Sequence, residues 1–176
     1  MGSSPTRGTN KTTHIELFFF QNYPKMITKT EALQLLSKSK ISLITYSSIG
    51  ELYKDEILSE LNFNEIKQLD SQSSLKSIFR DITLDKLLDN KKDTDFILLD
   101  LNEVKVSLTG LNRQAIVERL IRKFSSIDSE YKLIITVMAH KTMDESYSAP
   151  NWLLYSSYLV LGIGEGNTIK ALKSRY

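Results

Sequence analysis

The stretch Asp95-Phe96-Ile97-Leu98-Leu99-Asp100-Leu101 constrains the fold most, because an unbroken apolar run leads straight into an aspartate. An apolar run without polar alternation indicates a strand covered on both faces, as in the middle of a parallel sheet. A carboxylate at the carboxyl end of such a strand lies where open α/β sheets bind their ligands. The plainer interpretation is a core strand that ends in a turn-forming aspartate.

Similar apolar runs predict strands over residues 41–46 and 132–139, and the segments between them have helical patterns. Thr28-Lys29-Thr30-Glu31 matches a capping box and predicts a helix that ends at 38–40. Ser48-Ile49-Gly50-Glu51 matches a second box, whose helix should reach residue 61 with Leu52, Ile57, Leu58 and Leu61 facing inward. Residues 111–127 form a third predicted helix, and residues 102–110 a polar loop.

The remaining segments are less regular. Residues 65–69 read as a short strand, and residues 74–79 and 84–90 as short helices. Gly164-Glu165-Gly166-Asn167 lies between two apolar segments and predicts a β-hairpin. Strands that alternate with helices and close with this hairpin predict an α/β sandwich with a mostly parallel sheet.

Composition excludes several classes of site. The 176 residues include no cysteine and only two histidines, so thiol chemistry and a zinc-type ligand cluster are ruled out. We expect no bound metal or cofactor. The net charge of +2 permits nucleic-acid binding through a local patch but does not argue for it. No apolar run is long enough to span a bilayer, so we expect a cytoplasmic protein without membrane contact.

Three segments are expected along the chain. Residues 1–13 are polar and turn-forming and predict a disordered tail. Residues 14–25 contain Phe18-Phe19-Phe20 and predict a hydrophobic arm or short strand that packs on its own domain or on a neighbour. Residues 26–176 should form a single domain.

The order of motifs over residues 41–176 resembles the core of the RecA-like ATPases, which include recombinases and their paralogs, KaiC-type proteins and DnaB-type helicases. The strand ending at Asp100 resembles their Walker B strand, and the strand ending at His140 resembles the one that carries a polar γ-phosphate sensor. The segment ending Lys173-Ser174-Arg175 resembles the strand whose Lys-x-Arg reaches a neighbouring subunit's ATP. This resemblance implies a three-layer sandwich with the P-loop NTPase fold and a C-terminal antiparallel hairpin.

The phosphate loop departs from that family. Its pattern is Gly-x-x-x-x-Gly-Lys-Ser/Thr, in which backbone N–H groups and the lysine hold the phosphates. The aligned stretch here is degenerate, with Leu52 at the lysine position and Tyr53 at the hydroxyl position; it reads Tyr46, Ser47, Ser48, Ile49, Gly50, Glu51, Leu52, Tyr53. Lys54 lies about 200° further round the helix, which argues against it as a substitute. We therefore expect no ordinary ATP binding and no catalytic residues.

The resemblance also implies contacts with DNA. The loops at 102–112 and 141–151 correspond to segments that contact DNA in recombinases. Lys105, Arg113 and Lys141 would meet phosphates there, and Tyr147 would stack on a base of single-stranded DNA.

The favoured hypothesis is a catalytically inactive recombinase-paralog-like accessory protein that modulates DNA recombination or repair through a partner ATPase. Self-association is also compatible with the sequence. A first alternative is a pseudo-ATPase subunit of a KaiC-type assembly that does not act on DNA. A second is an ATPase with a non-standard phosphate loop. DNA binding by the basic loops would separate the first two, and nucleotide binding would identify the third.

Overall fold

The structure, a computed structural model, describes residues 25–66, 68–70, 95–107, 113–126, 131–139 and 149–174. The expected tail, nearly all of the expected arm, and the helices expected at 74–79 and 84–90 lie outside these residues. His140, Lys141, Tyr147 and Arg175 also lie outside them. The expectations for these segments therefore stay predictions.

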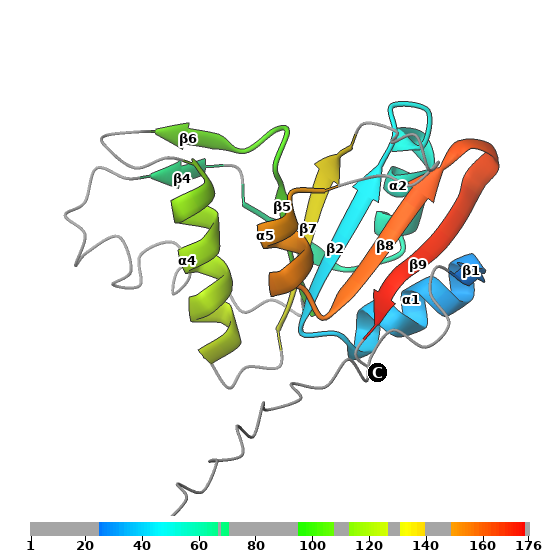
Figure 1. Ribbon diagram of the computed structural model, residues 1–176, viewed down its shortest axis with the longest axis horizontal. Coiled ribbons are helices and arrows are strands. Elements are labelled where there is room, and N and C mark those ends of the chain that lie inside the picture. Colours follow the sequence, from blue (N-terminus) through cyan, green and yellow to red (C-terminus); the bar gives the residue numbers. More distant parts are fainter. Residues whose placement is uncertain are drawn as a thin grey trace, which may run out of the picture.

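A mostly parallel sheet of seven strands forms the centre of the molecule (Figure 1). Its strand order is β1-β9-β8-β2-β7-β5-β3, in which only the β1–β9 and β8–β9 pairs are antiparallel. The strands are β1 (Lys25–Ile27), β2 (Ile41–Tyr46), β3 (Phe63–Glu65), β5 (Phe96–Asp100), β7 (Lys132–Met138), β8 (Leu159–Gly164) and β9 (Thr168–Ser174). The predicted α/β class and its mostly parallel sheet are confirmed.

Two further strands form a small separate sheet. β4 (Gln68–Asp70) pairs in parallel with β6 (Lys105–Ser107). The prediction of a loop over residues 102–110 is therefore wrong at residues 105–107. The strand expected at 65–69 is divided between the end of β3 and the start of β4. Three-residue strands carry too little periodicity to be recognised in a sequence.

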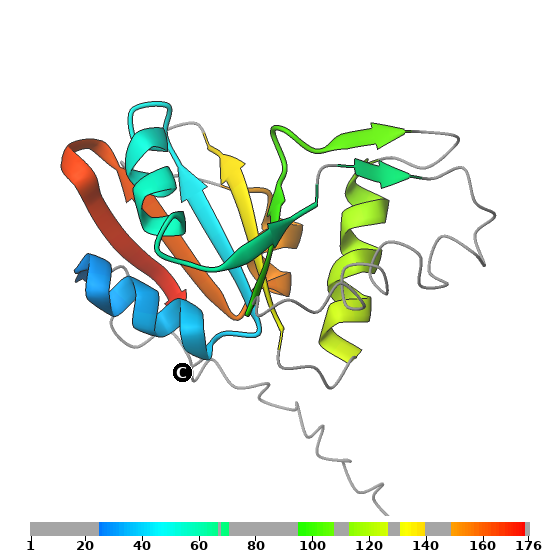
Figure 2. The same cartoon turned by 180° about the vertical axis from the view of Figure 1, so that it is seen from behind.

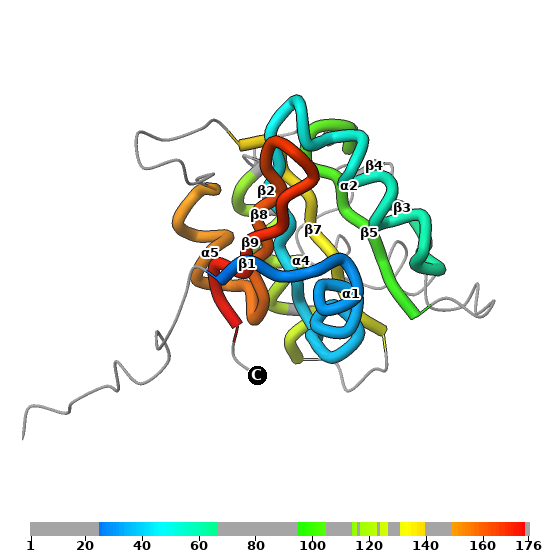
Figure 3. The backbone as a smooth tube through the Cα atoms, turned by 90° about the vertical axis from the view of Figure 1, so that its right-hand side faces the viewer, coloured from blue at the N-terminus to red at the C-terminus, as the bar shows by residue number. Residues whose placement is uncertain are grey.

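Helices cover both faces of the main sheet, which gives three layers (Figures 2 and 3). The helices α1 (Lys29–Lys38) and α2 (Glu51–Leu58) pack on one face, and α4 (Arg113–Ser126) and α5 (Asn151–Ser156) on the other. Alternate β2 residues enter the two cores: Leu43 joins the α4–α5 side, and Ile44 the α1–α2 side. This double cover explains why every residue of β2, β5 and β8 is buried.

The predicted C-terminal hairpin is confirmed. β8 and β9 pair antiparallel through a tight turn over Glu165–Asn167. Gly166 has a φ of 65°, a left-handed conformation that costs glycine little, and Asn167 has a φ of 56°. The Gly-Asn pair in the sequence therefore marked the correct turn.

The predicted capping box at α1 is confirmed. The Thr28 hydroxyl accepts a hydrogen bond from the Glu31 N–H at 3.2 Å, and the Glu31 carboxylate accepts one from the Thr28 N–H at 2.7 Å. These two bonds satisfy backbone donors that a helix N-terminus otherwise leaves to water. The bond from Thr28 lowers the pKa of the Glu31 carboxyl, since it favours the charged form.

This cap should contribute measurably to stability. Thr28→Ala should lower the free energy of unfolding by about 1 kcal/mol, the usual cost of losing such a cap. Thr30→Ala is the matched control, because Thr30 is exposed in the first turn and alanine has the higher helix propensity. Urea unfolding of the two variants measures the difference. An equal loss in both would contradict a capping role for Thr28.

Candidate functional site

The candidate site lies at the edge of the sheet where β2, β5, β7 and β8 end. Parallel strands present their carboxyl ends on one side, so Tyr46 at the end of β2 and Asp100 at the end of β5 reach the same edge. β7 lies between them, with Met138 opposite Tyr46 and Thr136 opposite Asp100 in the register. The topology thus brings Asp100 and the turn expected to be a degenerate phosphate loop to one place.

The turn between β2 and α2 is short and bonded to itself. It comprises the four residues between Tyr46 and Glu51. The Gly50 N–H donates to the Ser47 backbone oxygen at 2.9 Å and to its hydroxyl at 3.0 Å, and the Ser47 N–H donates to Ile163 at 3.3 Å. A Cβ on residue 50 would lie 3.0 Å from the Ile163 oxygen, so a side chain there would force the turn away from β8. These backbone donors are used within the protein instead of wrapping an anion.

The start of α2 differs from its prediction. The N-cap is Gly50, which forms no side-chain cap bond, so the predicted capping box at Ser48 is wrong. The Ser47 hydroxyl takes the Gly50 N–H instead, and the chain enters the helix two residues later than the box required. Because glycine is tolerated at N-caps, the helix starts there without a side-chain acceptor.

The orientation of α2 also corrects the sequence interpretation. Leu52 was expected to face inward, but 83% of it is exposed. Lys54 is 6% exposed and faces the sheet. The two positions differ by about 200° on a helix, so turning one outward necessarily turns the other inward. The sequence interpretation placed Leu52 toward the core, and the structure places Lys54 there instead.

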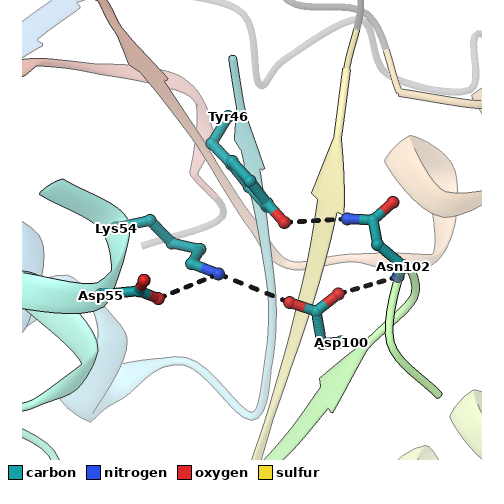
Figure 4. Close-up of polar contacts among 5 residues, drawn as sticks. All are labelled: Tyr46, Lys54, Asp55, Asp100 and Asn102. Atoms are coloured by element: carbon teal, nitrogen blue, oxygen red, sulfur yellow. Dashed lines mark hydrogen bonds and ion pairs between the residues drawn. The ribbon is translucent and has the colours of Figure 1, made fainter. Parts of the chain in front are cut away.

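Lys54 forms a buried ion pair with Asp100 (Figure 4). Its ammonium nitrogen lies 3.5 Å from Asp100 Oδ2, and each of these side chains is only 7% exposed. A second carboxylate oxygen, from the more exposed Asp55, lies 3.0 Å from the same nitrogen. The ammonium also lies 4.5 Å from the centre of the Tyr46 ring, within the range of a cation–π contact.

The other Asp100 oxygen is also occupied. Asp100 Oδ1 accepts the backbone N–H of Asn102 at 2.8 Å, which is an Asx-type turn. The Asn102 side-chain amide donates to the Tyr46 hydroxyl at 2.8 Å, joining the ends of β2 and β5 (Figure 4). Both carboxylate oxygens thus have protein partners, and the plainer interpretation of Asp100 as a turn former is supported.

The pKa directions agree with a charged, closed cluster. Burial tends to lower the pKa of Lys54, but its hydrogen bond to Asp55 and the charge of Asp100 contribute to a net rise above the ordinary value of 10.5. The Lys54 ammonium therefore stays charged at neutral pH, and its contribution to stability is lost as the pH rises above that value. Burial, helped by the charge of Asp100, raises the pKa of the Tyr46 phenol, which keeps it neutral.

Three further candidate residues lie on other elements: Lys105, Arg113 and Lys173. Lys105 begins β6 and Arg113 begins α4, but their side chains are not described. Lys173 lies opposite Val160 at the start of β8, so it occupies the amino-terminal edge of the sheet, away from Asp100. Its ammonium donates to the Leu154 oxygen at 2.6 Å and to the Tyr155 oxygen at 3.5 Å, at the C-terminal end of α5.

Sequence reasoning did not assign Lys54, Asp55 and Asn102 to this cluster. Asn102 could have been found, because Asp-x-Asn after a buried strand is typical of an Asx turn. Lys54 could have been assigned to the cluster only if Leu52 had been expected on the outward face of α2.

Within the ranges that the structure describes, no group of three or more His, Asp or Glu side chains could hold a metal ion. Over the same ranges no helix has both the length and the apolar character needed to cross a bilayer.

Comparison with known proteins leaves the chain without an assigned family. No family model matches the sequence, and no curated protein matches it significantly. The classification therefore depends on the fold alone: an α/β protein with a mostly parallel, seven-stranded mixed sheet.

The buried ion pair gives a sharp test of this geometry. Lys54→Met should lower the free energy of unfolding by about 3 kcal/mol or more, because it leaves the buried Asp100 carboxylate without its cation. The double variant Lys54→Met with Asp100→Asn should recover much of this loss, since an amide can still accept the Asn102 N–H. Urea unfolding of the wild type, both single variants and the double variant measures the coupling.

Lys29→Met is the control for removing a charge alone. Lys29 pairs with Glu56 and Glu60 at the surface, where the partners remain hydrated after its loss. Its effect should be much smaller than that of Lys54→Met. If the effects of the two substitutions at 54 and 100 simply add, the two side chains do not interact as described.

Proposed function

We propose that this protein is a RecA-like accessory factor that has no nucleotide site of its own and modulates DNA recombination or repair through a partner ATPase. One observation carries the proposal: the Lys54 ammonium lies 3.5 Å from Asp100 Oδ2, and the resemblance assigns Asp100 to the metal-binding position of the family. A site closed by its own side chains leaves association as the means of action.

The strand order supports the RecA-like part of the proposal. β2, which leads into the degenerate loop, is flanked by β7 and β8, and β5 with Asp100 lies beyond β7. The resemblance seen in the sequence assigns these strands to the phosphate-loop, sensor, closing and Walker B positions. The four strands are consecutive neighbours in the sheet, so the segments that this resemblance assigns to nucleotide binding end at one edge.

The turn after β2 supports the loss of nucleotide binding. A phosphate loop needs several free N–H groups that converge on an anion, together with a lysine at their end. Here the Gly50 N–H is bonded within the turn, Leu52 stands at the lysine position, and the nearby lysine is paired with two carboxylates. The DNA-related part of the proposal depends on Lys105, Arg113, Lys141 and Tyr147 and is supported by the sequence resemblance alone.

The first test is nucleotide binding. Calorimetric titration of the full chain with Mg-ATP should give no binding isotherm at millimolar concentrations, because neither a phosphate loop nor a free metal-binding carboxylate is offered. Asp100→Asn should behave like the wild type in this assay. A clear one-to-one isotherm that Asp100→Asn abolishes would reject the proposal and favour an ATPase with a non-standard site.

The second test concerns the trans-acting end of the chain. In hexameric relatives the Lys-x-Arg arginine stabilises charge that develops on a neighbour's transferred phosphate. Since Lys173 is bonded to α5 carbonyl oxygens, Arg175 is the better candidate for this role. Arg175→Ala should abolish stimulation of a partner ATPase, isolated by pull-down, without weakening the association.

Lys170→Ala is the matched control, because it removes one positive charge from the same C-terminal segment. The partner's ATP turnover is measured with wild-type, Arg175→Ala and Lys170→Ala protein at saturating binding. Equal turnover with the wild type and Arg175→Ala would leave the trans-acting role without support.

A further inference from the structure

A β-bulge interrupts β9 close to its end. On β8, Leu161 pairs with Ala171, but its neighbour Val160 pairs with Lys173, so Leu172 is an extra residue in β9. Ala171 packs in the core on the α1–α2 side, whereas Leu172 packs against the core on the α4–α5 side. Regular alternation would return residue 173 to the α1–α2 side. The bulge places Lys173 opposite Val160 instead, on the α4–α5 side of the sheet.

This orientation allows Lys173 to cap α5. Its ammonium donates to the backbone oxygens of Leu154 at 2.6 Å and Tyr155 at 3.5 Å. The last carbonyl oxygens of a helix have no donor within the helix, and a positive charge is favourable beside them. The Ser157 N–H and hydroxyl already donate to the Leu153 oxygen, at 3.1 and 2.8 Å, so Lys173 serves the two oxygens that follow. The lysine therefore joins the end of β9 to the end of α5.

The backbone on both sides of Lys173 is also held. Leu172 packs against the α4–α5 core, and Ser174, which pairs with Leu159, is 5% exposed. The chain is thus fixed up to Ser174, the residue before Arg175 in the sequence. The Lys173 ammonium is committed to α5 and does not extend from the sheet toward a neighbouring subunit.

We infer that Lys173 is a positioning residue, which latches the end of β9 to α5 and so fixes the point from which Arg175 leaves the sheet. Side chains two positions apart on an extended chain share one side, so an extended continuation of β9 gives Arg175 the α5 side as well. The inference rests on the proposed function in one respect, that Arg175 acts on a partner's nucleotide. The latch itself depends on no partner.

The two basic residues then have different roles. The resemblance to RecA-like proteins assigns both to a neighbour's ATP, but α5 occupies Lys173. Placement is decisive for a group that stabilises developing charge, since a misplacement of about 1 Å can cost a hundredfold in rate. A fixed strand end also reduces the conformational entropy that Arg175 loses on contact. Lys173 thus contributes through position, and Arg175 through charge.

The latch can be tested without a partner. Carboxypeptidase Y removes residues one at a time from the C-terminus of the full chain, and mass spectrometry of the products shows where it slows. With the wild type, digestion should slow at Ser174, because β9 is paired and buried there. Lys173→Met keeps an apolar stem but loses both bonds to α5. Digestion past Ser174 should then be about tenfold faster, the factor that loss of a hydrogen bond to a charged group implies for local opening.

Two variants serve as controls for the digestion. Lys173→Arg retains donors for the carbonyl oxygens and should restore the wild-type pattern. Lys170→Met removes the same charge from the same side of β9, opposite Gly162, and should leave the pattern unchanged. Circular dichroism spectra and melting curves verify that all three variants stay folded.

The positioning role is tested with the partner ATPase isolated by pull-down. Two quantities are measured for the wild type, Lys173→Met, Lys173→Arg and Arg175→Ala: the maximal stimulated turnover, and the concentration of this protein that gives half of it. Lys173→Met should lower the maximal turnover and leave the half-maximal concentration unchanged, because it misplaces Arg175 without removing a contact that binds the partner. Lys173→Arg should restore the turnover.

Two results would overturn the inference. The first is equal digestion of the wild type and Lys173→Met, which would show that the contact does not hold the strand end. The second is full stimulation by Lys173→Met where Arg175→Ala abolishes it, which would reject the positioning role and keep the proposed function. Faster digestion of Lys173→Met, with stimulation unaffected by Arg175→Ala, would reject the proposed function and with it the positioning role, while the latch stands.

Discussion

The burial of β2 on both faces and along both edges is the constraint on which the rest of the structure depends. Its backbone pairs with β7 and β8, and its side chains enter the two cores alternately. A shift of one residue would exchange the two sets of side chains, so that Ile44 and Tyr46 would have to fit the core that holds Ile41 and Leu43. The carboxyl end of β2 is therefore fixed, and with it the turn that follows and the direction in which α2 leaves the sheet.

The strands and most helices could be predicted because the signals for them are local. Apolar runs such as 96–99 and 133–135 are long enough to indicate double cover, and the Thr28–Glu31 box identifies a helix start on its own. The small sheet could not be predicted in the same way. β4 and β6 are only three residues long, and each depends on a partner distant in the sequence.

The site could be predicted in its location but not in its contacts. Asp100 and the turn after β2 were placed together by topology, as expected for strands that end at one edge. The error at α2 has a physical cause: a leucine on an eight-residue helix is normally assigned to the core, and a lysine to solvent. Here Asp100 lies beneath the helix. Burying its charge without a cation would cost more free energy than burying one more leucine would contribute. The buried aspartate therefore sets the face of α2, a long-range effect that helix periodicity alone does not contain.

The same interaction explains why closing the site and exposing Leu52 occur together. A buried ion pair adds little stability compared with well-packed apolar groups, since the cost of desolvating both charges offsets most of their attraction. Its consequence here is geometric. With Lys54 turned toward the buried Asp100, Leu52 on the opposite face of α2 lies in solvent. One orientation of α2 therefore decides both which side chain meets Asp100 and which side chain lies in solvent.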